Sequence, residues 1–196
     1  MAQARVLPAV GRWMLPLTRP VRYTSLAISL HWTIAVLLLV QLTLGWWMVD
    51  IPKHPPGVRA GWFNLHKSLG LVLFALIAAR LAWRLTHRAP ELPSWIPAWQ
   101  RGAAAASHGL MYLLMVIAPL SGYLGSSFTR YPIVFFGTKL PHWGWEWVAA
   151  KEVLSRIHFA STLLLALLVA VHVVAALTHL VKRDGVFQRM WPTELR

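Results

Sequence analysis

Long apolar segments alternate with short polar ones along the chain. Segments 23–49, 102–129 and 157–181 contain no Asp, Glu, Lys or Arg. A fourth apolar segment, 62–83, carries Lys67 near its start and Arg80 near its end, where long cationic side chains can reach the headgroups. A hydrocarbon core of ~30 Å needs about 20 apolar residues. The pattern therefore predicts an all-α integral membrane protein, a four-helix bundle with helices at about 23–49, 62–87, 102–129 and 151–182.

Length and composition fit one membrane domain. The chain has 196 residues, of which 57% are hydrophobic, and we expect the bundle to occupy residues 23–192. Residues 1–22 are basic but contain no apolar core followed by a cleavage site. We therefore expect this segment to be an uncleaved cytoplasmic lead-in rather than a signal peptide.

The basic residues predict the orientation of the bundle. An even number of spans puts both termini on one side, and that side, counted with Arg80, holds twelve Lys and Arg residues against seven on the other. Because cytoplasmic loops carry the excess of positive charge, both termini are expected in the cytoplasm. The net charge of +13 is divided among short loops between apolar spans, which favours membrane-facing charge over nucleic-acid binding.

The sequence contains no cysteine. This excludes cysteine-ligated iron–sulfur clusters and haem attached through a Cys-x-x-Cys-His arrangement. Any haem must therefore be held without a covalent bond, as in a b-type cytochrome.

Two of the nine histidines lie within segment 157–181. His158 and His172 are fourteen residues apart, nearly four helical turns, so both imidazoles face the same way about 21 Å apart. A polar side chain at two depths of one membrane helix is costly unless something binds it. The spacing indicates two bound groups, one near each membrane face.

Two further histidines match these depths. On the cytoplasmic side, His31 lies nine residues past Arg22 and His172 lies ten before Lys182. On the outer side, His66 lies seven residues past Arg59 and His158 lies seven past Lys151. Facing helices of a four-helix bundle can hold a cofactor between them. We therefore predict two b haems, with His31 and His172 on the inner iron and His66 and His158 on the outer iron.

The cytoplasmic side leaves alternatives open. His108, seven residues past Arg101, also fits the depth of His172, so counting does not choose between His31 and His108 as the inner ligand. If His31 ligates, His108 and His179 are free to donate hydrogen bonds to a quinone carbonyl beside the inner haem. Both histidines would otherwise be simple interfacial residues.

Three cations are candidate partners for haem propionates. Arg80 lies fourteen residues after His66 at cytoplasmic depth, and Lys67 and Arg156 lie at outer depth. Extension of these side chains toward the headgroups explains the same positions. A haem-free, histidine-lined transporter is the alternative of another class, and a red protein with a sharp reduced α-band would exclude it.

Several stretches follow one another in a characteristic order: YTSLAISLHW at 23–32, NLHKSLG at 64–70, HGLMY at 108–112, APLSG at 118–122, then His158 and the segment 172–185. Together they resemble the bacterial cytochrome b561 family of di-haem membrane proteins, over about 23–192. In that family the haem ligands come from the first, second and fourth helices. The resemblance thus implies His31, His66, His158 and His172, and favours His31 over His108.

The resemblance also implies an activity in the bacterial inner membrane. Family members include a superoxide oxidase that passes electrons from superoxide at the outer face to ubiquinone, and related subunits reduce the quinone pool for hydrogenases and formate dehydrogenases. We expect the first activity, with an electron-transfer subunit of a periplasmic dehydrogenase or hydrogenase as the alternative.

The outer side carries a formal charge of +4, from seven Lys and Arg residues against Asp50, Glu146 and Glu152. A cationic rim steers small anions such as superoxide, and it would equally dock a protein partner. The chain departs from the family in its basic lead-in and in the Trp-rich segment 142–147. Because of the Trp-rich segment, the resemblance does not determine the identity of the electron donor.

Overall fold

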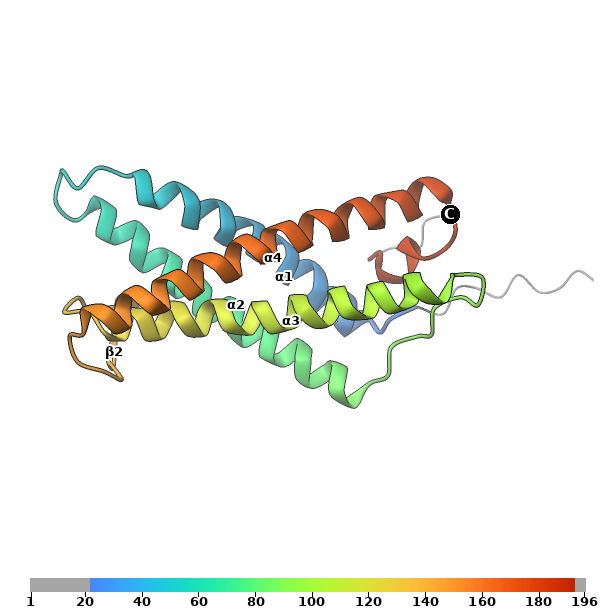
Figure 1. Ribbon diagram of the computed structural model, residues 1–196, viewed down its shortest axis with the longest axis horizontal. Coiled ribbons are helices and arrows are strands. Elements are labelled where there is room, and N and C mark those ends of the chain that lie inside the picture. The colour runs from blue at the N-terminus through green and yellow to red at the C-terminus, as the bar shows by residue number, and fades with distance from the viewer. Residues whose placement is uncertain (1–21, 193–196) are drawn as a thin grey trace, which may run out of the picture.

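A computed structural model describes residues 22–192, so most of the basic lead-in lies outside the described residues. The described residues form four long helices and a small hairpin, and the hairpin precedes the last helix (Figure 1). All four helices are long and apolar enough to cross a membrane, which confirms the predicted helical membrane bundle. The elements are α1 (Ser25–Trp47), η1 (Met48–Asp50), α2 (Val58–Thr86), α3 (Ala98–Ser127), β1 (Ile133–Phe135), β2 (Thr138–Leu140), α4 (Val148–Lys182) and η2 (Phe187–Met190).

Helices α2, α3 and α4 begin several residues before the apolar segments of the sequence, whereas α1 lies within its segment. The helix α2 begins at Val58 rather than Trp62, directly after Gly57, whose φ of 90° places it in a turn. Arg59 lies in the first turn of α2 and donates a hydrogen bond from its guanidinium to the carbonyl of Ile51 (2.8 Å). The charge-free run marks hydrocarbon depth, whereas the helix itself continues into the headgroup region.

The helices run alternately up and down, and the α1–α2 pair crosses the α3–α4 pair (Figure 1). Segments 22–24, 87–97 and 183–192 meet at one end of the bundle, which we call the terminal end. Arg189 there donates to the carbonyl of Glu91 (2.9 Å), and Trp32 donates to the carbonyl of Met190 (2.7 Å). The opposite end, formed by 51–57 and 128–147, is called the hairpin end.

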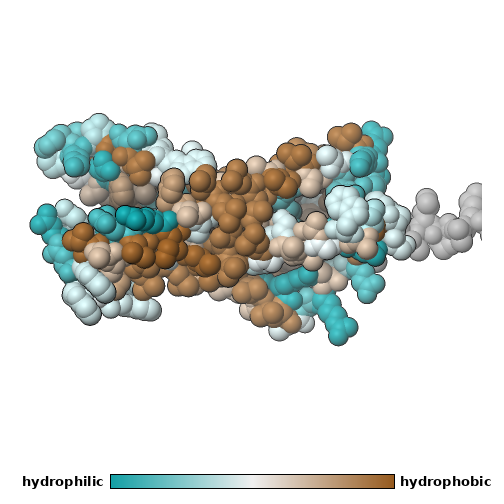
Figure 2. Space-filling view, in the orientation of Figure 1, coloured by the Kyte–Doolittle hydropathy of each residue, from teal (hydrophilic) through white to brown (hydrophobic). Residues whose placement is uncertain are grey.

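The helices pack through a core at mid-height. Ile34 and Leu38 of α1, Leu73 and Ile77 of α2, Met111 and Leu114 of α3, and Leu165 of α4 form one buried cluster. Many apolar side chains of the four helices are exposed, and Figure 2 shows an apolar band around the middle, with polar residues at both ends. This is the surface expected where lipid tails surround the bundle.

The hairpin is an element that the hydrophobic pattern did not predict. Strands β1 and β2 pair antiparallel, with Ile133 opposite Leu140, and Ile133 is fully buried. Ser68 of α2 fastens the hairpin, because its hydroxyl accepts the N–H of Phe136 (3.0 Å). The same hydroxyl lies within donating distance of the carbonyls of Val134 and Asn64. The hairpin is thus held against α2 at Ser68, which lies two residues after His66.

Candidate functional site: two histidine pairs

The first histidine pair lies toward the hairpin end. His66 of α2 and His158 of α4 face one another with ring centroids 6.2 Å apart and ring planes at 88°. The second pair lies toward the terminal end, where His31 of α1 and His172 of α4 have ring centroids 6.2 Å apart and planes at 75°. Helix α4 therefore contributes one ring to each pair, as the fourteen-residue spacing predicted.

The two pairs are separated by the apolar core. Leu165 lies seven residues from both His158 and His172 and is 2% exposed. Because seven residues is almost two full turns, Leu165 shares the face of α4 that carries both histidines. The arrangement is two polar levels with a packed hydrophobic layer between them.

The separation within each pair fits a single iron atom. A ring nitrogen binds a metal at about 2 Å, and the ring centroid lies roughly 1 Å farther away, so two imidazoles on opposite sides have centroids about 6 Å apart. Residues 22–192 contain no group of three or more His, Cys, Asp or Glu side chains that could hold a metal by themselves. A pair of imidazoles suits a metal whose other ligands come from a macrocycle, as in haem.

The backbone around the first pair leaves room for both rings. A Cβ on Gly122 of α3 would lie 3.0 Å from Nδ1 of His158, and a Cβ on Gly45 of α1 would lie 3.1 Å from Cε1 of His66. Real Cβ atoms seldom approach so closely. The two glycines therefore let α1 and α3 approach the histidines of α2 and α4.

Hydrogen bonds orient the ligand candidates of this pair. The Nδ1 of His158 donates to the carbonyl of Ala118 (2.7 Å), which leaves Nε2 with its lone pair, as in a metal-binding imidazole. The Nδ1 of His66 is buried without a hydrogen-bond partner. Gln41 donates to the backbone carbonyl of His66 (2.9 Å), which links the middle of α1 to α2 beside this ring.

The structure also brings His108 close to the second pair. Its ring centroid lies 5.5 Å from that of His172, with planes at 68°. This separation is shorter than the 6.2 Å between His31 and His172, which equals that of the first pair. The residue His108 is exposed, whereas His31 is partly buried. The geometry favours His31 as the partner of His172.

The three cations differ in their surroundings. Arg80 donates from Nε to the hydroxyl of Tyr112 (2.9 Å), so it stays within the bundle between α2 and α3. Lys67 is partly buried beside His66. The side chain of Arg156 is 83% exposed, 4.0 Å from the carboxylate of Glu152. Arg80 and Lys67 are thus the better placed candidates for a propionate.

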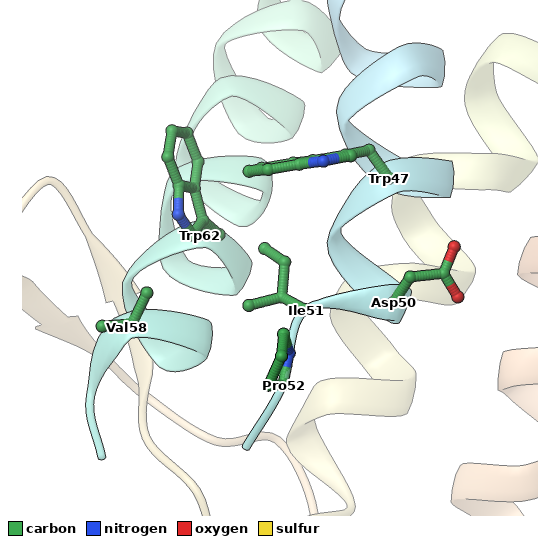
Figure 3. A pocket seen from close by; sticks show the side chains of 6 residues that line it. All are labelled: Trp47, Asp50, Ile51, Pro52, Val58 and Trp62. Atoms are coloured by element: carbon green, nitrogen blue, oxygen red, sulfur yellow. The ribbon is translucent and has the colours of Figure 1, made fainter. Parts of the chain in front are cut away.

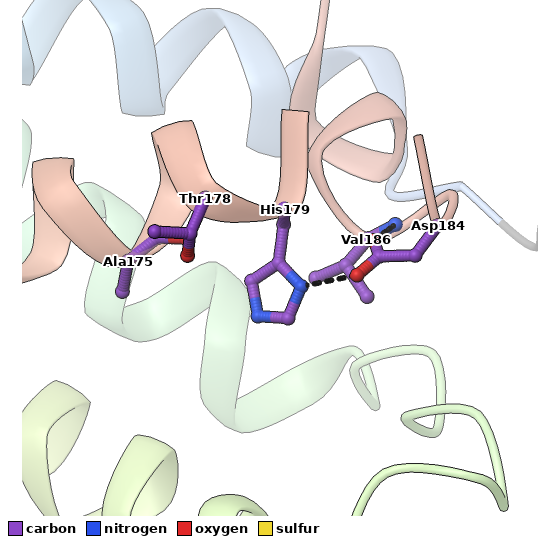
Figure 4. Close-up of polar contacts among 5 residues, drawn as sticks. All are labelled: Ala175, Thr178, His179, Asp184 and Val186. Carbon is purple, nitrogen blue, oxygen red and sulfur yellow. Dashed lines mark hydrogen bonds and ion pairs between the residues drawn. The ribbon is translucent and has the colours of Figure 1, made fainter. Parts of the chain in front are cut away.

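His179 at the terminal end makes a contact that its position in the sequence did not indicate. Its Nδ1 lies 2.6 Å from Oδ2 of Asp184, and Figure 4 shows the carboxylate meeting the edge of the imidazole. The side chains of His179 and Asp184 are 26% and 13% exposed, respectively. His179 therefore lies at the surface of the bundle with one ring nitrogen fixed.

A separate cleft of about 290 Å³ opens at the hairpin end. Figure 3 shows it between the end of α1 and the start of α2, with Trp47 and Trp62 at its inner side. The two indole rings meet edge to face, with centroids 4.9 Å apart. None of the predicted site residues lines this cleft, and its open apolar walls are typical of the membrane interface.

Sequence reasoning missed several residues that support the site. Single glycines, a serine or a glutamine in an apolar helix have many possible roles, and only the crossing of the helices shows which of them contact a histidine. Ser68, Ala118, Gly122 and Asp184 fall within stretches that carried the family resemblance, but the resemblance gave them no role. The missed residues are Gln41, Gly45, Ser68, Ala118, Gly122 and Asp184.

Comparison with known proteins identifies the family of this chain over the whole helical bundle. Residues 22–193 match the family described as Prokaryotic cytochrome b561. The chain is 32% identical over 178 residues to "Cytochrome b561 homolog 2" of Escherichia coli (strain K12), covering 87% of this chain and 92% of the relative. It is 31% identical over 183 residues to "Cytochrome b562" of Cereibacter sphaeroides, covering 89% and 98%. "Probable superoxide oxidase CybB" of Yersinia pestis is 24% identical over 178 residues, covering 87% and 96%.

Proposed function

Because the chain belongs to the prokaryotic cytochrome b561 family, whose members transfer electrons in membranes, we propose that it is a di-haem superoxide oxidase. It would pass electrons across the bacterial inner membrane from superoxide to ubiquinone. Two superoxide ions give two electrons and two molecules of dioxygen, and ubiquinone takes up those electrons with two protons to form ubiquinol.

The observation that carries the proposal is the equal separation of the imidazole rings in the two histidine pairs. Each has a centroid separation of 6.2 Å, and each lies on its own side of the apolar core. In this proposal His66 and His158 hold the outer haem, and His31 and His172 hold the inner haem. When bound, haem b would supply the one-electron chemistry.

The outer site is placed at the hairpin end. Positive charge would attract superoxide there, because a cationic rim raises the encounter rate of small anions. Lys67 lies directly beside His66, and Lys151 and Arg156 lie on the exposed first turns of α4. Superoxide appears in the name of one relative at 24% identity, which supports this donor.

The quinone site is placed at the terminal end. His108 lies 5.5 Å from His172 by ring centroids, and His179 lies almost two turns farther along the same face of α4. Imidazole N–H groups can donate hydrogen bonds to a carbonyl oxygen. The excess of Lys and Arg in the segments assigned to this side supports a cytoplasmic position for this end in our proposal.

One observation favours a second candidate, an electron-transfer subunit that receives electrons from a periplasmic dehydrogenase or hydrogenase. Trp143, Trp145 and Trp147 at the hairpin end are 72%, 71% and 50% exposed. Exposed aromatic residues are enriched where proteins bind one another. In this case the cationic rim would dock a protein in place of steering superoxide.

Stopped-flow mixing of the purified oxidised protein with superoxide separates the two candidates. The proposal predicts reduction of the haem α-band by superoxide, abolished by superoxide dismutase, and formation of one ubiquinol for every two superoxide ions consumed. Haem that stays oxidised under superoxide but is reduced by a periplasmic dehydrogenase would contradict the superoxide proposal and support the subunit role.

A further inference from the structure

The end of α4 contains a histidine–carboxylate contact that ligation of haem does not require. His179 lies in the last turn of α4, and Arg183, with a φ of 52°, ends the helix in a left-handed conformation. This turn brings Asp184 back against His179, with Nδ1 and Oδ2 2.6 Å apart. The other carboxylate oxygen, Oδ1, accepts the N–H of Val186 (3.1 Å). Both oxygens of Asp184 are therefore fixed in position.

The contact determines where the proton of the imidazole lies. An ionised carboxylate can only accept hydrogen bonds, so Nδ1 of His179 carries a proton directed at Asp184. The other ring nitrogen, Nε2, points away from the carboxylate in Figure 4. A neighbouring carboxylate fixes the tautomer and the orientation of an imidazole. Nε2 can therefore carry a second proton while Asp184 compensates the charge.

We propose that Asp184 is a positioning residue that makes His179 a proton donor to the reduced quinone. This rests on the proposed quinone site at His179. As ubiquinone receives two electrons that originate from two superoxide ions, Nε2 of His179 gives one proton to a quinone oxygen. The second proton comes from water at the same surface. His179 is then reprotonated from solvent, to which its side chain is 26% exposed, and Asp184 remains ionised throughout.

A purely structural role for Asp184 makes a different prediction. If Asp184 only shaped the turn, it would influence quinone reduction through its hydrogen bond to the N–H of Val186. Val186 has a φ of −69°, which a proline ring adopts without strain. The substitution Val186→Pro thus removes the turn hydrogen bond while keeping the contact between Asp184 and His179, and it is the matched control.

The test compares Asp184→Asn, His179→Ala, the double variant and Val186→Pro in the haem-loaded protein. The amide of Asp184→Asn keeps an oxygen for the N–H of Val186 but lacks the charge. Since general acid catalysis contributes 10²–10⁴-fold in rate, we expect kcat for quinone reduction to fall about tenfold or more in Asp184→Asn, with KM for quinone changed less than about twofold. Val186→Pro should keep the parent kcat.

Two further measurements distinguish action through His179 from an effect on folding. The double variant should be no slower than His179→Ala, because residues that act as one unit are not additive. In ¹⁵N NMR of histidine-labelled protein, the His179 signal, assigned by its loss in His179→Ala, should show protonated Nδ1 and should shift in Asp184→Asn. Melting temperatures and haem spectra confirm that each variant is folded.

The possible outcomes separate this inference from the proposed function. If Asp184→Asn keeps the kcat of the parent protein while His179→Ala is slow, Asp184 has no role in proton donation. The proposed quinone site at His179 is then still supported. Additive losses in the double variant, or a loss in Val186→Pro equal to that in Asp184→Asn, overturn the role of Asp184 in proton donation in favour of a turn-forming role. If His179→Ala reduces quinone with the same kinetics as the parent protein, the proposed quinone site is wrong, and the role of Asp184 is wrong with it.

Discussion

His158 donates a hydrogen bond from Nδ1 to the carbonyl oxygen of Ala118 across 2.7 Å. The two residues lie on α4 and α3, and Gly122 of α3 lies against the same imidazole ring. The bond leaves Nε2 available as a ligand and fixes the orientation of the ring, which is what a metal-binding histidine requires from its surroundings. Packing between α3 and α4 thereby sets the position of one proposed ligand of the outer haem.

The substitution Gly122→Ala tests this relationship. Its Cβ would lie 3.0 Å from Nδ1 of His158, so the ring must move and the bond to Ala118 must lengthen. We expect purified Gly122→Ala to retain less of the outer haem by reduced-minus-oxidised spectra. Gly102→Ala on the same helix is the control, because a Cβ there meets nothing within 4 Å. Equal haem content in the two variants would show that the Gly122 contact does not position the ligand.

Alanine substitution of each ligand candidate should reveal the pairing. His66→Ala and His158→Ala should lose the same haem, since each removes one axial ligand of the outer iron, and their remaining spectra should coincide. His31→Ala and His172→Ala should share the other remaining spectrum. His108→Ala is the control and should keep both haems. Loss of a haem in His108→Ala, with both retained in His31→Ala, would reassign the inner ligand.

Arg80 provides a test of electrostatics at the inner site. A cation near the iron disfavours the more positive ferric state, so Arg80→Gln should lower the midpoint potential of the inner haem. For a charge assumed to lie about 10 Å from the iron, an effective dielectric constant of about 20 gives a shift of some tens of millivolts. Potentiometric titration measures it, with Arg84→Gln as the control because Arg84 is exposed on the same helix. An inner potential that does not change would rule out Arg80 as an electrostatic neighbour.

Ser68 is expected to hold the hairpin against the bundle. Ser68→Ala removes the acceptor of the Phe136 N–H, and leaving such a group unsatisfied costs about 1–3 kcal/mol. The amide of Phe136 should therefore exchange hydrogen faster than in Ser155→Ala, a substitution at an exposed serine of α4. Exchange at Phe136 that matches the control would show that Ser68 does not fasten the hairpin.

The helices could be predicted from the sequence because membrane spans are determined locally. Each needs an uninterrupted apolar segment whose backbone is satisfied within itself, and all four predicted ranges overlap a helix of the structure. The juxtaposition of His158 with His66, and of His172 with His31, also follows from depth, because helices crossing one bilayer share a common axis. Ligation of haem by these pairs stays a prediction.

The remaining features depend on contacts between distant segments. Strands β1 and β2 have three residues each, too few to produce a periodic pattern, and the hairpin is anchored to Ser68 on another element. The roles of Gly45 and Gly122 depend on how the helices cross, which hydropathy does not describe. For the same reason depth alone left His31 and His108 as alternatives, whereas in the structure their ring separations from His172 and their burial differ.

The ratio of haem to protein tests the central claim most directly. Pyridine haemochrome analysis of the purified full-length chain, with the protein quantified by amino-acid analysis, should give two haems b per chain. Acid–acetone extraction should remove both, since the sequence contains no cysteine. A ratio near one, or haem that resists extraction, would contradict the assignment of one haem to each histidine pair.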